Sequence, residues 1–353
     1  MTVKIHLAPT PPCMGWVSMN RYWQALVNES AGDDTVHSLL PAGRLEAGAG
    51  PVWQRFWMRG VGYPWRIKTQ VKDGVLHVLD HSFADLLAYV NPGVKTVVTV
   101  HDLIPLTDPG DLSSQQVRRF KDRVQWVTRA DRVVCVSQHT AAEAQRLLGV
   151  PTERVRVLPN GASALPRPDP ALSARLQTLK PCLLSVGSAV PRKNLKLLAP
   201  LAAGLAARGI SPVIVRAGAS LPDSLAQGIR QHAELLELGQ VTDAELSAAY
   251  AGAAVTVVPS FQEGFGLPVL EAMLAGCPVA YSRATSLPEV AGDAGLSFDP
   301  HAVGEAVEVC ARLLENEELR QKQSELGRKR AAVFSWQHHW QGLRAVYNGL
   351  VSD

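Results

Sequence analysis

Short apolar runs alternate with stretches of helical periodicity along the whole chain, and this alternation constrains the fold more than any other feature of the sequence. Runs of this kind that end near glycine, proline, serine or aspartate are typical of buried strands. The predicted strands are residues 3–7, 75–80, 96–102, 132–137 and 155–161 in the first half, and 182–188, 211–218, 235–241, 254–260, 278–282 and 295–300 in the second. Because helical stretches separate the predicted strands, the pattern predicts parallel βαβ units and an α/β fold.

A second constraint is the segment PNGASALPRPDPALS at residues 159–173, which holds four prolines and a glycine and has no apolar periodicity. Such a segment predicts a linker. A chain of 353 residues also suits two domains better than one. We therefore predict one domain over residues 1–165 and another over residues 166–335. Each would be a doubly wound parallel sheet that binds ligands at the carboxyl ends of its strands, and two such sheets facing each other would form a cleft.

Composition excludes several classes of protein. Hydrophobic residues at 46% and charged residues at 19% describe a soluble globular chain, and a net charge of +3 is too small to predict a nucleic-acid partner. The cysteines are odd in number, scattered and never spaced C-x-x-C, so neither disulfides nor a zinc site is predicted; they are Cys13, Cys135, Cys182, Cys277 and Cys310. There is no signal-peptide pattern, and no apolar run reaches the roughly 18–20 residues that span a bilayer. These features predict a cytoplasmic protein.

The segment VVPSFQEGFGLPVLEAMLAGCPVA places a glycine-rich turn between a predicted strand and a predicted helix. Gly264 and Gly266 allow a ligand to approach the backbone closely, and Pro268 suits the first turn of a helix. The free N–H groups of such a helix start favour an anion, above all phosphate. Glu271 lies close enough to accept hydrogen bonds from ribose hydroxyls, and Glu263 reaches the far side of the phosphates. A glutamate in a first turn is equally a partner of the helix dipole, so a second element has to agree.

The second element is LLSVGSAVPRKNLKLLAP, in which a strand leads through a turn with Gly187 and Ser188 to Arg192 and Lys193. These two cations are predicted to open a helix, where the dipole disfavours positive charge. A bound polyanion would offset that cost, since arginine binds phosphate through two hydrogen bonds and lysine supplies a compact charge. The two elements together predict a site for a sugar nucleotide.

In this order, the motifs resemble those of the retaining glycosyltransferases of the GT-B fold, specifically family four, the nucleotide-sugar-dependent, glycogen-synthase-like glycosyl transferases of group 1. The resemblance is carried by the E-x7-E spacing from Glu263 to Glu271 and by the segments SVGSAVPRKNL, LGQVTDAELSAAYAGA, TSLPEVAGDAG, VVTVHDLIPL and FSWQHHWQGLRAVY. It implies two Rossmann-like domains facing a central cleft. Residues 1–165 would bind the acceptor, residues 166–335 would bind the nucleotide-sugar donor, and residues 336–353 would form a helix packing back toward the N-terminal domain.

The resemblance also implies roles for matching positions of the donor domain. Arg192 and Lys193 would contact the diphosphate, Glu263 would bind the hydroxyls of the transferred sugar, and Glu271 would bind the ribose. The other predicted donor-binding positions are Gly15, Gly187, Val241, Gly264, Phe265, Gly266 and Leu267. Among these, Val241 would lie beside the base.

On the other side of the cleft, His101 of VHDL would face the transferred sugar; the less favoured alternative is a strand-end histidine that only caps the sheet. The predicted catalytic residues are thus His101, Glu263, Arg192 and Lys193. The acceptor-side candidates are His81, Asp102 and Trp16. The first loop departs from the family, because many members have two glycines where this chain has Gly15 followed by Trp16. His338 and His339 are predicted to lie at the surface.

The resemblance implies transfer with retention at the anomeric carbon. Double displacement and front-face attack are both open, and front-face attack is favoured because no pair of carboxylates about 5 Å apart is predicted. Since cations and helix-start amides can stabilise the leaving diphosphate, neither a metal nor a cofactor is predicted. The expected reaction moves a hexose, mannose above all, from GDP-mannose or a UDP-hexose to a saccharide or lipid-linked saccharide in bacterial surface polysaccharide assembly. A catalytically silent sugar-nucleotide-binding partner protein and a GT-B nucleotide-sugar epimerase are the alternatives.

Residues 53–68, WQRFWMRGVGYPWRIK, mix aromatic and basic side chains and contain no acidic residue. The side chains concerned are Trp53, Phe56, Trp57, Tyr63 and Trp65, with Arg55, Arg59, Arg66 and Lys68. This mixture suits the surface of an anionic membrane, which predicts a peripheral enzyme at the inner face of the cell membrane. The alternative is that the aromatic side chains pack on their own domain and the arginines are solvated.

Overall fold

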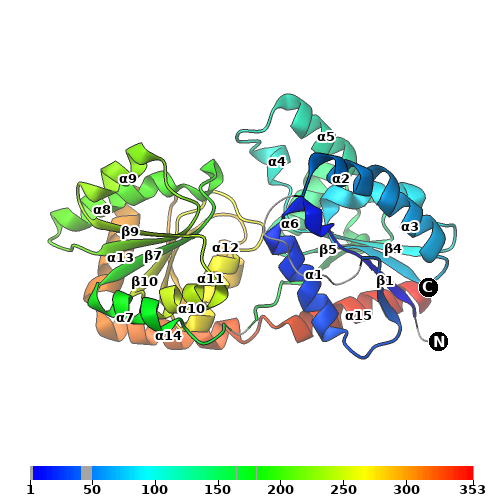
Figure 1. The fold of residues 1–353 in the computed structure, drawn as a ribbon. Helices are drawn as coiled ribbons and strands as arrows, with labels where there is room; N and C mark the ends of the chain where they lie inside the picture. The colour runs from blue at the N-terminus through cyan, green and yellow to red at the C-terminus, as the bar shows by residue number, and fades with distance from the viewer. Residues whose placement is uncertain (1–2, 41–49, 164, 180, 353) are drawn as a thin grey trace. The chain divides into compact units, whose positions relative to one another are not determined.

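The protein is built from two α/β units, each with one six-stranded parallel sheet and helices on both of its faces (Figure 1). The computed structural model describes residues 3–40, 50–163, 165–179 and 181–352. The first unit comprises Met1–Gly161 and Ser335–Asp353, and the second comprises Ala162–Phe334. The predicted α/β class, with a doubly wound parallel sheet in each half, is confirmed.

The first sheet has the strand order β2-β1-β3-β4-β5-β6. Its strands are β1 (Ile5–Ala8), β2 (Val36–Ser38), β3 (Val75–Val78), β4 (Lys95–Val100), β5 (Arg132–Cys135) and β6 (Val155–Val157). All of them except β2 coincide with predicted strands. The sequence did not predict β2 because it has three residues, lies at the sheet edge and is mostly exposed, so no apolar run marks it.

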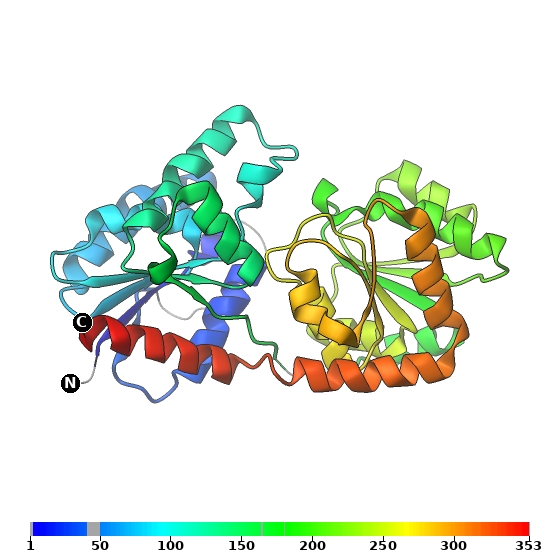
Figure 2. The ribbon, with the colours of Figure 1, turned by 180° about the vertical axis from the view of Figure 1, so that it is seen from behind.

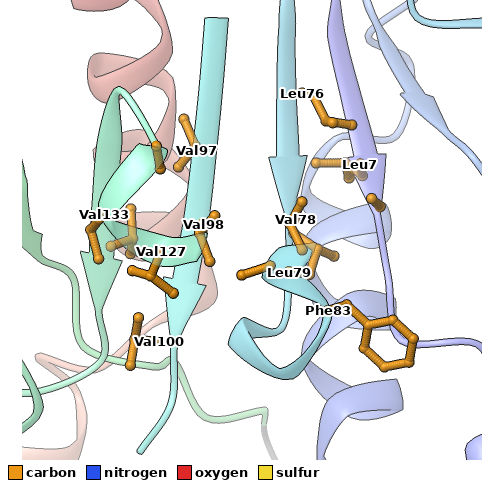
Figure 3. Packing of buried hydrophobic residues seen from close by; sticks show 14 of the residues in the cluster. Leu7, Leu76, Val78, Leu79, Phe83, Val97, Val98, Val100, Val127 and Val133 are labelled. Carbon is orange, nitrogen blue, oxygen red and sulfur yellow. The ribbon is translucent and has the colours of Figure 1, made fainter. Parts of the chain in front are cut away.

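Helices bury the first sheet. They are α1 (Val17–Glu29), α2 (Val52–Trp57), α3 (Tyr63–Gln70), α4 (Ile104–Thr107), α5 (Ser114–Val124), α6 (Gln138–Glu143) and α15 (Trp336–Ser352), with a π-helical turn η2 (Met58–Gly62) and a 3-10 segment η3 (His81–Tyr89). Between them and the sheet, Leu7, Val78, Val98 and Phe83 form part of one apolar core (Figure 3). Each such buried side chain stabilises the fold by about 1.5–3 kcal/mol, so the core fixes the strand ends that carry the site.

The C-terminal helix α15 lies along the first unit (Figure 2), and a buried polar network joins it to that unit. The Tyr347 hydroxyl lies 2.6 Å from Nδ1 of His77, and Nε2 of His77 lies 2.8 Å from Oγ1 of Thr99. The Tyr22 hydroxyl, on α1, lies 3.3 Å from the same Oγ1 and 2.9 Å from Nε2 of His339. The network therefore joins two strands, the first helix and the last helix.

The two neighbouring histidines of α15 lie in different environments. His338 is exposed, as predicted, but His339 is only 3% exposed, so the prediction that it lies at the surface is wrong. Adjacent residues of a helix point in different directions, and His339 points into the polar network. Burial lowers the pKa of His339 to about 4 and that of His77 to about 3, so both rings are neutral at neutral pH.

The second sheet has the strand order β12-β11-β10-β7-β8-β9. Its strands are β7 (Cys182–Gly187), β8 (Val213–Gly218), β9 (Glu234–Gly239), β10 (Val255–Val258), β11 (Val279–Ser282) and β12 (Leu296–Phe298), and all were predicted. Its helices are α7 (Pro170–Thr178), α8 (Leu198–Ala207), α9 (Asp223–Arg230), α10 (Asp243–Gly252), α11 (Leu267–Ala275), α12 (Leu287–Ala291), α13 (Val303–Glu315) and α14 (Glu317–Ala331).

The predicted linker over residues 159–173 is too long at its C-terminal end. Helix α7 already begins at Pro170, and the Asp169 side chain caps it by accepting a hydrogen bond from the Leu172 amide over 2.7 Å. Proline suits the first turn of a helix, where its missing N–H costs nothing. The prolines of this segment therefore mark the start of α7 as well as the connection that precedes it.

Both strand orders contain a point where the direction of winding reverses. In the second sheet β7 and β10 are neighbours there, and in the first sheet β1 and β3 are. The loops that leave the carboxyl ends of such strands diverge, which leaves a crevice for a ligand. These loops carry Gly187 and Glu263 in the second unit, and Gly15 and His81 in the first.

Candidate functional site

At the reversal point of the second sheet, Glu263 gathers the two cations that were predicted to bind phosphate. Nζ of Lys193 lies 2.5 Å from Oε1 of Glu263, and Nη1 of Arg192 lies 3.4 Å from Oε2. Ser260 donates a hydrogen bond from its hydroxyl to Oε1 over 2.7 Å. The Glu263 side chain is 8% exposed and that of Arg192 is 31% exposed, so Arg192 is the more accessible member of the cluster.

The Glu263 carboxyl stays ionised although it is buried. Desolvation acts to raise its pKa, while the charge and hydrogen bond of Lys193, with help from Arg192 and Ser260, hold the pKa below its usual value. The cluster therefore has two positive charges against one negative charge. Its surplus positive charge favours an anionic ligand.

The backbone around the cations differs from the prediction. Pro191–Lys193 form a separate 3-10 turn, and a second 3-10 turn, Leu195–Leu197, continues into α8 at Leu198, so both cations precede the predicted helix in a turn of their own. Asn194 follows the turn with a φ of 50°. Its side-chain amide donates to the carbonyl oxygens of Pro259 at 3.1 Å and Pro300 at 3.0 Å. These bonds hold the turn beside the loop that follows β10.

Residues that the sequence analysis did not single out hold the loop between β10 and α11. The Glu263 amide donates to Oγ1 of Thr285 over 3.0 Å, and the Ser286 hydroxyl lies 2.9 Å from the carbonyl oxygens of both Glu263 and Phe265. Thr285 has a φ of 49°, which is unusual for a β-branched residue and is typical of binding sites. Both side chains lie in TSLPEVAGDAG, but their residue types alone gave no signal of this role.

The other predicted donor-side positions lie on neighbouring loops and on α11. Glu271 accepts a hydrogen bond from the Tyr250 hydroxyl over 2.9 Å, which fixes one of its carboxylate oxygens. Val241 lies half-buried between β9 and α10. Gly264, Phe265, Gly266 and Leu267 form the approach to α11 and its first residue. Within that approach, Gly266 has a φ of 109°, which favours glycine.

A hollow of about 190 Å³ lies at the reversal point of the first sheet. It is lined by Trp16, Ser18, Met19, Asp80, His81, Ser82, His101 and Asp102, and thus contains all of the predicted acceptor-side candidates together with His101. The predicted site residues therefore form two groups, one in each unit. Four lining residues were not predicted, and they are Ser18, Met19, Asp80 and Ser82.

Hydrogen bonds fix the two histidines of this hollow. Nε2 of His101 lies 2.8 Å from the carbonyl oxygen of Leu79 and must donate to it, so Nδ1 of the neutral ring bears the lone pair. The His101 amide donates to Nδ1 of His81 over 3.3 Å. Burial lowers the pKa of His101, although Asp80 opposes this effect. His101 is therefore a neutral ring held in one orientation rather than a positive charge.

Asp80 is the buried anion of the hollow. Its carboxylate accepts hydrogen bonds from the Thr10 hydroxyl at 2.7 Å and from the Ser82 amide at 2.8 Å and hydroxyl at 2.7 Å. Burial acts to raise the pKa of Asp80, but His81, His101 and these hydrogen bonds keep it below its usual value. Its negative charge orders the loop that bears His81.

The loop after β1 contains the predicted departure from the family pattern. Gly15 has a φ of 72° and ends a short 3-10 turn, Pro12–Met14. Trp16 then occupies the position just before α1; it is 38% exposed, and its ring meets Phe83 edge to face at 6.2 Å. The indole, packed on one side and open on the other, provides an apolar wall to the hollow.

The segment with mixed aromatic and basic side chains forms one helical path, α2, η2 and α3. Its exposed apolar side chains, here called the aromatic face, are Val52, Trp53, Phe56, Trp57, Val61 and Trp65, and they are between 52% and 80% exposed. Residues 53, 57, 61 and 65 are four apart, so they share one side of the path. Tyr63, by contrast, is fully buried in the core, and the expectation that it joins this surface is wrong.

The cations of the same path divide into two kinds. Arg59 is held by Asp85 at 3.0 Å and lies over the Phe83 ring, and Arg66 donates to the Leu39 carbonyl oxygen at 2.9 Å. Lys68 is exposed. Further exposed cations lie on α5, which packs on η3 beside α3, and they are Arg118, Arg119 and Lys121.

Within the described part of the chain, no group of three or more His, Cys, Asp or Glu side chains is placed to hold a metal ion. Likewise, none of the described helices is both long and apolar enough to cross a membrane.

Comparison with known proteins decides the family. Residues 173–330 match the family model described as glycosyl transferases group 1, and residues 26–164 match that of glycosyltransferase family 4. The chain is 32% identical over 258 residues to O-antigen chain mannosyltransferase B of Escherichia coli. This alignment covers 69% of this chain and 68% of the relative. The chain belongs to the group 1, family 4 glycosyltransferases.

This glycosyltransferase has further relatives of the same kind. The serotype-specific mannosyltransferase WbdA of Escherichia coli is 32% identical over 265 residues, an alignment that spans 69% of this chain but only 32% of that protein. Among solved structures, sucrose-phosphate synthase from Thermosynechococcus elongatus gives a TM-score of 0.74 at 19% identity, covering 99% of this chain and 100% of that one. HepE from Anabaena, in complex with UDP and glucose, gives 0.74 at 17% identity with the same coverage. At such identities the likeness establishes the shared GT-B fold.

Proposed function

We propose that this glycosyltransferase moves a hexose, with mannose the favoured sugar, from a nucleoside-diphosphate sugar to a saccharide or lipid-linked saccharide, with retention at the anomeric carbon. The observation that carries the proposal is the cluster of Lys193, Arg192 and Glu263 at the reversal point of the second sheet. The mannosyltransferases among its relatives support the choice of sugar. HepE, whose structure contains UDP, supports a nucleotide-bearing donor.

In this proposal the second unit binds the donor. Arg192 and Lys193 neutralise the charge that develops on the leaving diphosphate, which removes the need for a metal ion. Glu263 holds both cations and accepts hydrogen bonds from hydroxyls of the transferred sugar. Glu271, with one oxygen fixed by Tyr250, accepts from the ribose hydroxyls.

The first unit binds the acceptor in the hollow at β1 and β3. His101 offers the lone pair of Nδ1 to a sugar hydroxyl, since its Nε2 is already bound to Leu79. Trp16 presents an apolar ring surface on which the C–H face of a sugar ring can pack. The attacking hydroxyl then approaches the anomeric carbon on the face from which the diphosphate leaves.

A screen of nucleotide sugars tests the donor assignment. We expect one among UDP-, GDP-, ADP- and dTDP-sugars to raise the midpoint of thermal unfolding and to be slowly hydrolysed, in the presence of EDTA as in its absence. Glu271→Gln should lose the shift, whereas Glu315→Gln, which changes an exposed glutamate of α13, should keep it. If no nucleotide sugar stabilises the wild type, the donor site is wrong. Binding without any turnover would favour a catalytically silent partner protein.

The aromatic face supports a lipid-linked acceptor. A contiguous exposed apolar surface of this kind marks an interaction site, and Lys68 with the cations of α5 favours a negatively charged partner. Aromatic side chains beside lysine and arginine suit the interface of an anionic bilayer. We therefore assign the aromatic face to contact with an anionic membrane that holds the acceptor.

Vesicle binding tests this assignment. The wild type should sediment with vesicles of phosphatidylcholine and phosphatidylglycerol, and much less with pure phosphatidylcholine. The variant Trp53→Ser/Phe56→Ser/Trp57→Ser should bind at least about a hundredfold more weakly, because it removes three apolar contacts. The control Val190→Ser/Val333→Ser changes exposed apolar side chains of the second unit and should bind as the wild type does. Unchanged binding by the triple variant, or a dimer that only this variant loses, would contradict membrane contact.

A further inference from the structure

Arg216 lies inside the apolar strand β8 and is 1% exposed, which makes it one of the largest fully buried side chains. A buried charge is costly unless it is compensated. Arg216 makes no ion pair with any described residue; Glu237, on the neighbouring strand, acts on it only at a distance. Burial lowers the pKa of the guanidinium to about 10, so Arg216 still carries its charge at neutral pH.

The guanidinium compensates its burial by binding backbone carbonyl groups, one on β8 itself and three at the end of β7 and in the turn that follows it. Nη1 donates to the carbonyl oxygens of Ser185 at 3.0 Å and Ala217 at 2.7 Å, and Nη2 donates to those of Gly187 and, at 3.3 Å, Ser188. Nε has no partner among the described residues. One side chain therefore binds two successive carbonyl groups of the turn that leaves β7.

This binding determines where the amides of the turn point. In a planar trans peptide the C=O and the following N–H point in opposite directions. Because the Gly187 and Ser188 carbonyl groups face Arg216, the N–H groups of Ser188 and Ala189 point away from it, and neither has a partner in the described structure. The Lys193 side chain lies beside the same turn. If Gly187 had a Cβ atom, that atom would lie 4.0 Å from Nζ of Lys193.

Successive free N–H groups beside a cation form an anion-binding concavity. We propose that Arg216 is a positioning residue of the donor site, which holds the turn after β7 so that the Ser188 and Ala189 amides bind the donor diphosphate. Arg216 itself does not touch the donor. The bound diphosphate would in turn stabilise the buried guanidinium charge. This role rests on the proposed function, because it needs a diphosphate-bearing donor in the second unit.

Substitution of Arg216 by lysine tests the role, because lysine keeps the charge but cannot bind several carbonyl groups in one plane. For UDP or GDP, whichever the wild type binds, calorimetry should give an affinity about tenfold or more lower in Arg216→Lys. The affinity for the corresponding nucleoside, measured by competition, should stay the same because a nucleoside has no phosphate. Arg208→Lys, at an exposed arginine of the same unit, is the matched control.

A second variant keeps the test decisive if Arg216→Lys does not fold. Ser188→Pro removes one of the two amide protons at an exposed position and leaves Arg216 in place, and it should also lose diphosphate affinity and keep nucleoside affinity. Full UDP or GDP affinity in either folded variant overturns the proposal, and so does an equal loss for nucleoside and nucleoside diphosphate. A wild type that binds neither UDP nor GDP overturns the proposed function instead, and with it the basis of this role.

Discussion

The two units place their candidate sites at the same point of their sheets but fill them with different chemistry. In the second unit the site is ionic, because Glu263 is held between Lys193 and Arg192. In the first unit the hollow presents the neutral ring of His101, which a carbonyl group holds, beside the buried Asp80. The comparison teaches that the fold determines where a ligand binds. The charge of the side chains at that place determines which kind of ligand binds there.

Removal of Lys193 should have the largest effect, because it breaks the ionic site. Lys193→Ala leaves the buried Glu263 without its main partner, and we expect a loss of about 3 kcal/mol in the free energy of unfolding. Turnover should fall by at least about a hundredfold, since the leaving diphosphate loses a cation. Urea unfolding and transfer assays measure the two effects. Lys196→Ala, which removes an exposed lysine three positions away, serves as control, and equal activity of the two variants would contradict the ionic role.

Removal of the neutral ring should affect transfer and leave donor binding intact. For His101→Ala we expect transfer to fall by about tenfold to a thousandfold, because the lost group orients a substrate hydroxyl. Affinity for the nucleoside diphosphate should not change, since His101 lies in the other unit. Steady-state kinetics together with calorimetry separate the two quantities. His338→Ala, at an exposed histidine, should behave as the wild type, and an equal loss of nucleotide affinity in His101→Ala would remove the distinction between the two sites.

Acid should distinguish the two units. The folded-state pKa values of His77 and His339 are lowered to about 3 and about 4 from 6.5, so the unfolded chain binds more protons below pH 6.5 and the first unit loses stability as the pH falls. At pH 5 this amounts to about 2 kcal/mol for each histidine. The lowered pKa of Glu263 costs the second unit stability only below about pH 4.5.

Hydrogen exchange followed separately in each unit at pH 7.5 and pH 5 measures this difference. Protection in the first unit should fall, whereas protection in the second unit should hold. His339→Gln should weaken the pH dependence of the first unit, because it removes one of the buried histidines whose pKa is lowered. Equal losses in both units would contradict the assignment of neutral histidines to the first.

The smallest expected effect sharpens the donor side. Tyr250→Phe removes the hydroxyl that fixes one oxygen of Glu271 and should weaken donor affinity about three- to tenfold, the contribution of one hydrogen bond. The turnover number should change little, because the ribose lies away from the reacting bond. Tyr89→Phe, at an exposed tyrosine, is the control. A large fall in turnover with unchanged affinity would place Glu271 elsewhere in the site.

All strands except β2 could be predicted, and so could the start of α11 beside Pro268, because their signals are local: apolar runs, a glycine-rich turn and a proline. The pairing of the cations with Glu263 could not be predicted, because Glu263 lies seventy positions beyond Lys193 and only the fold brings the two side chains together. Arg216 gave a weak signal, a single arginine within the apolar run SPVIVRAG. The burial of His339 gave none, because the residues that surround it come from distant parts of the chain.

The last helix belongs to the first unit, so the second unit is an insertion between Gly161 and Ser335. On the ribosome, the second unit is therefore made as one uninterrupted segment and can fold before synthesis ends. The first unit has to wait, because Tyr347 and His339, which complete its buried polar network, follow the second unit along the chain. A nascent chain would thus complete the second unit before helix α15 can pack on the first.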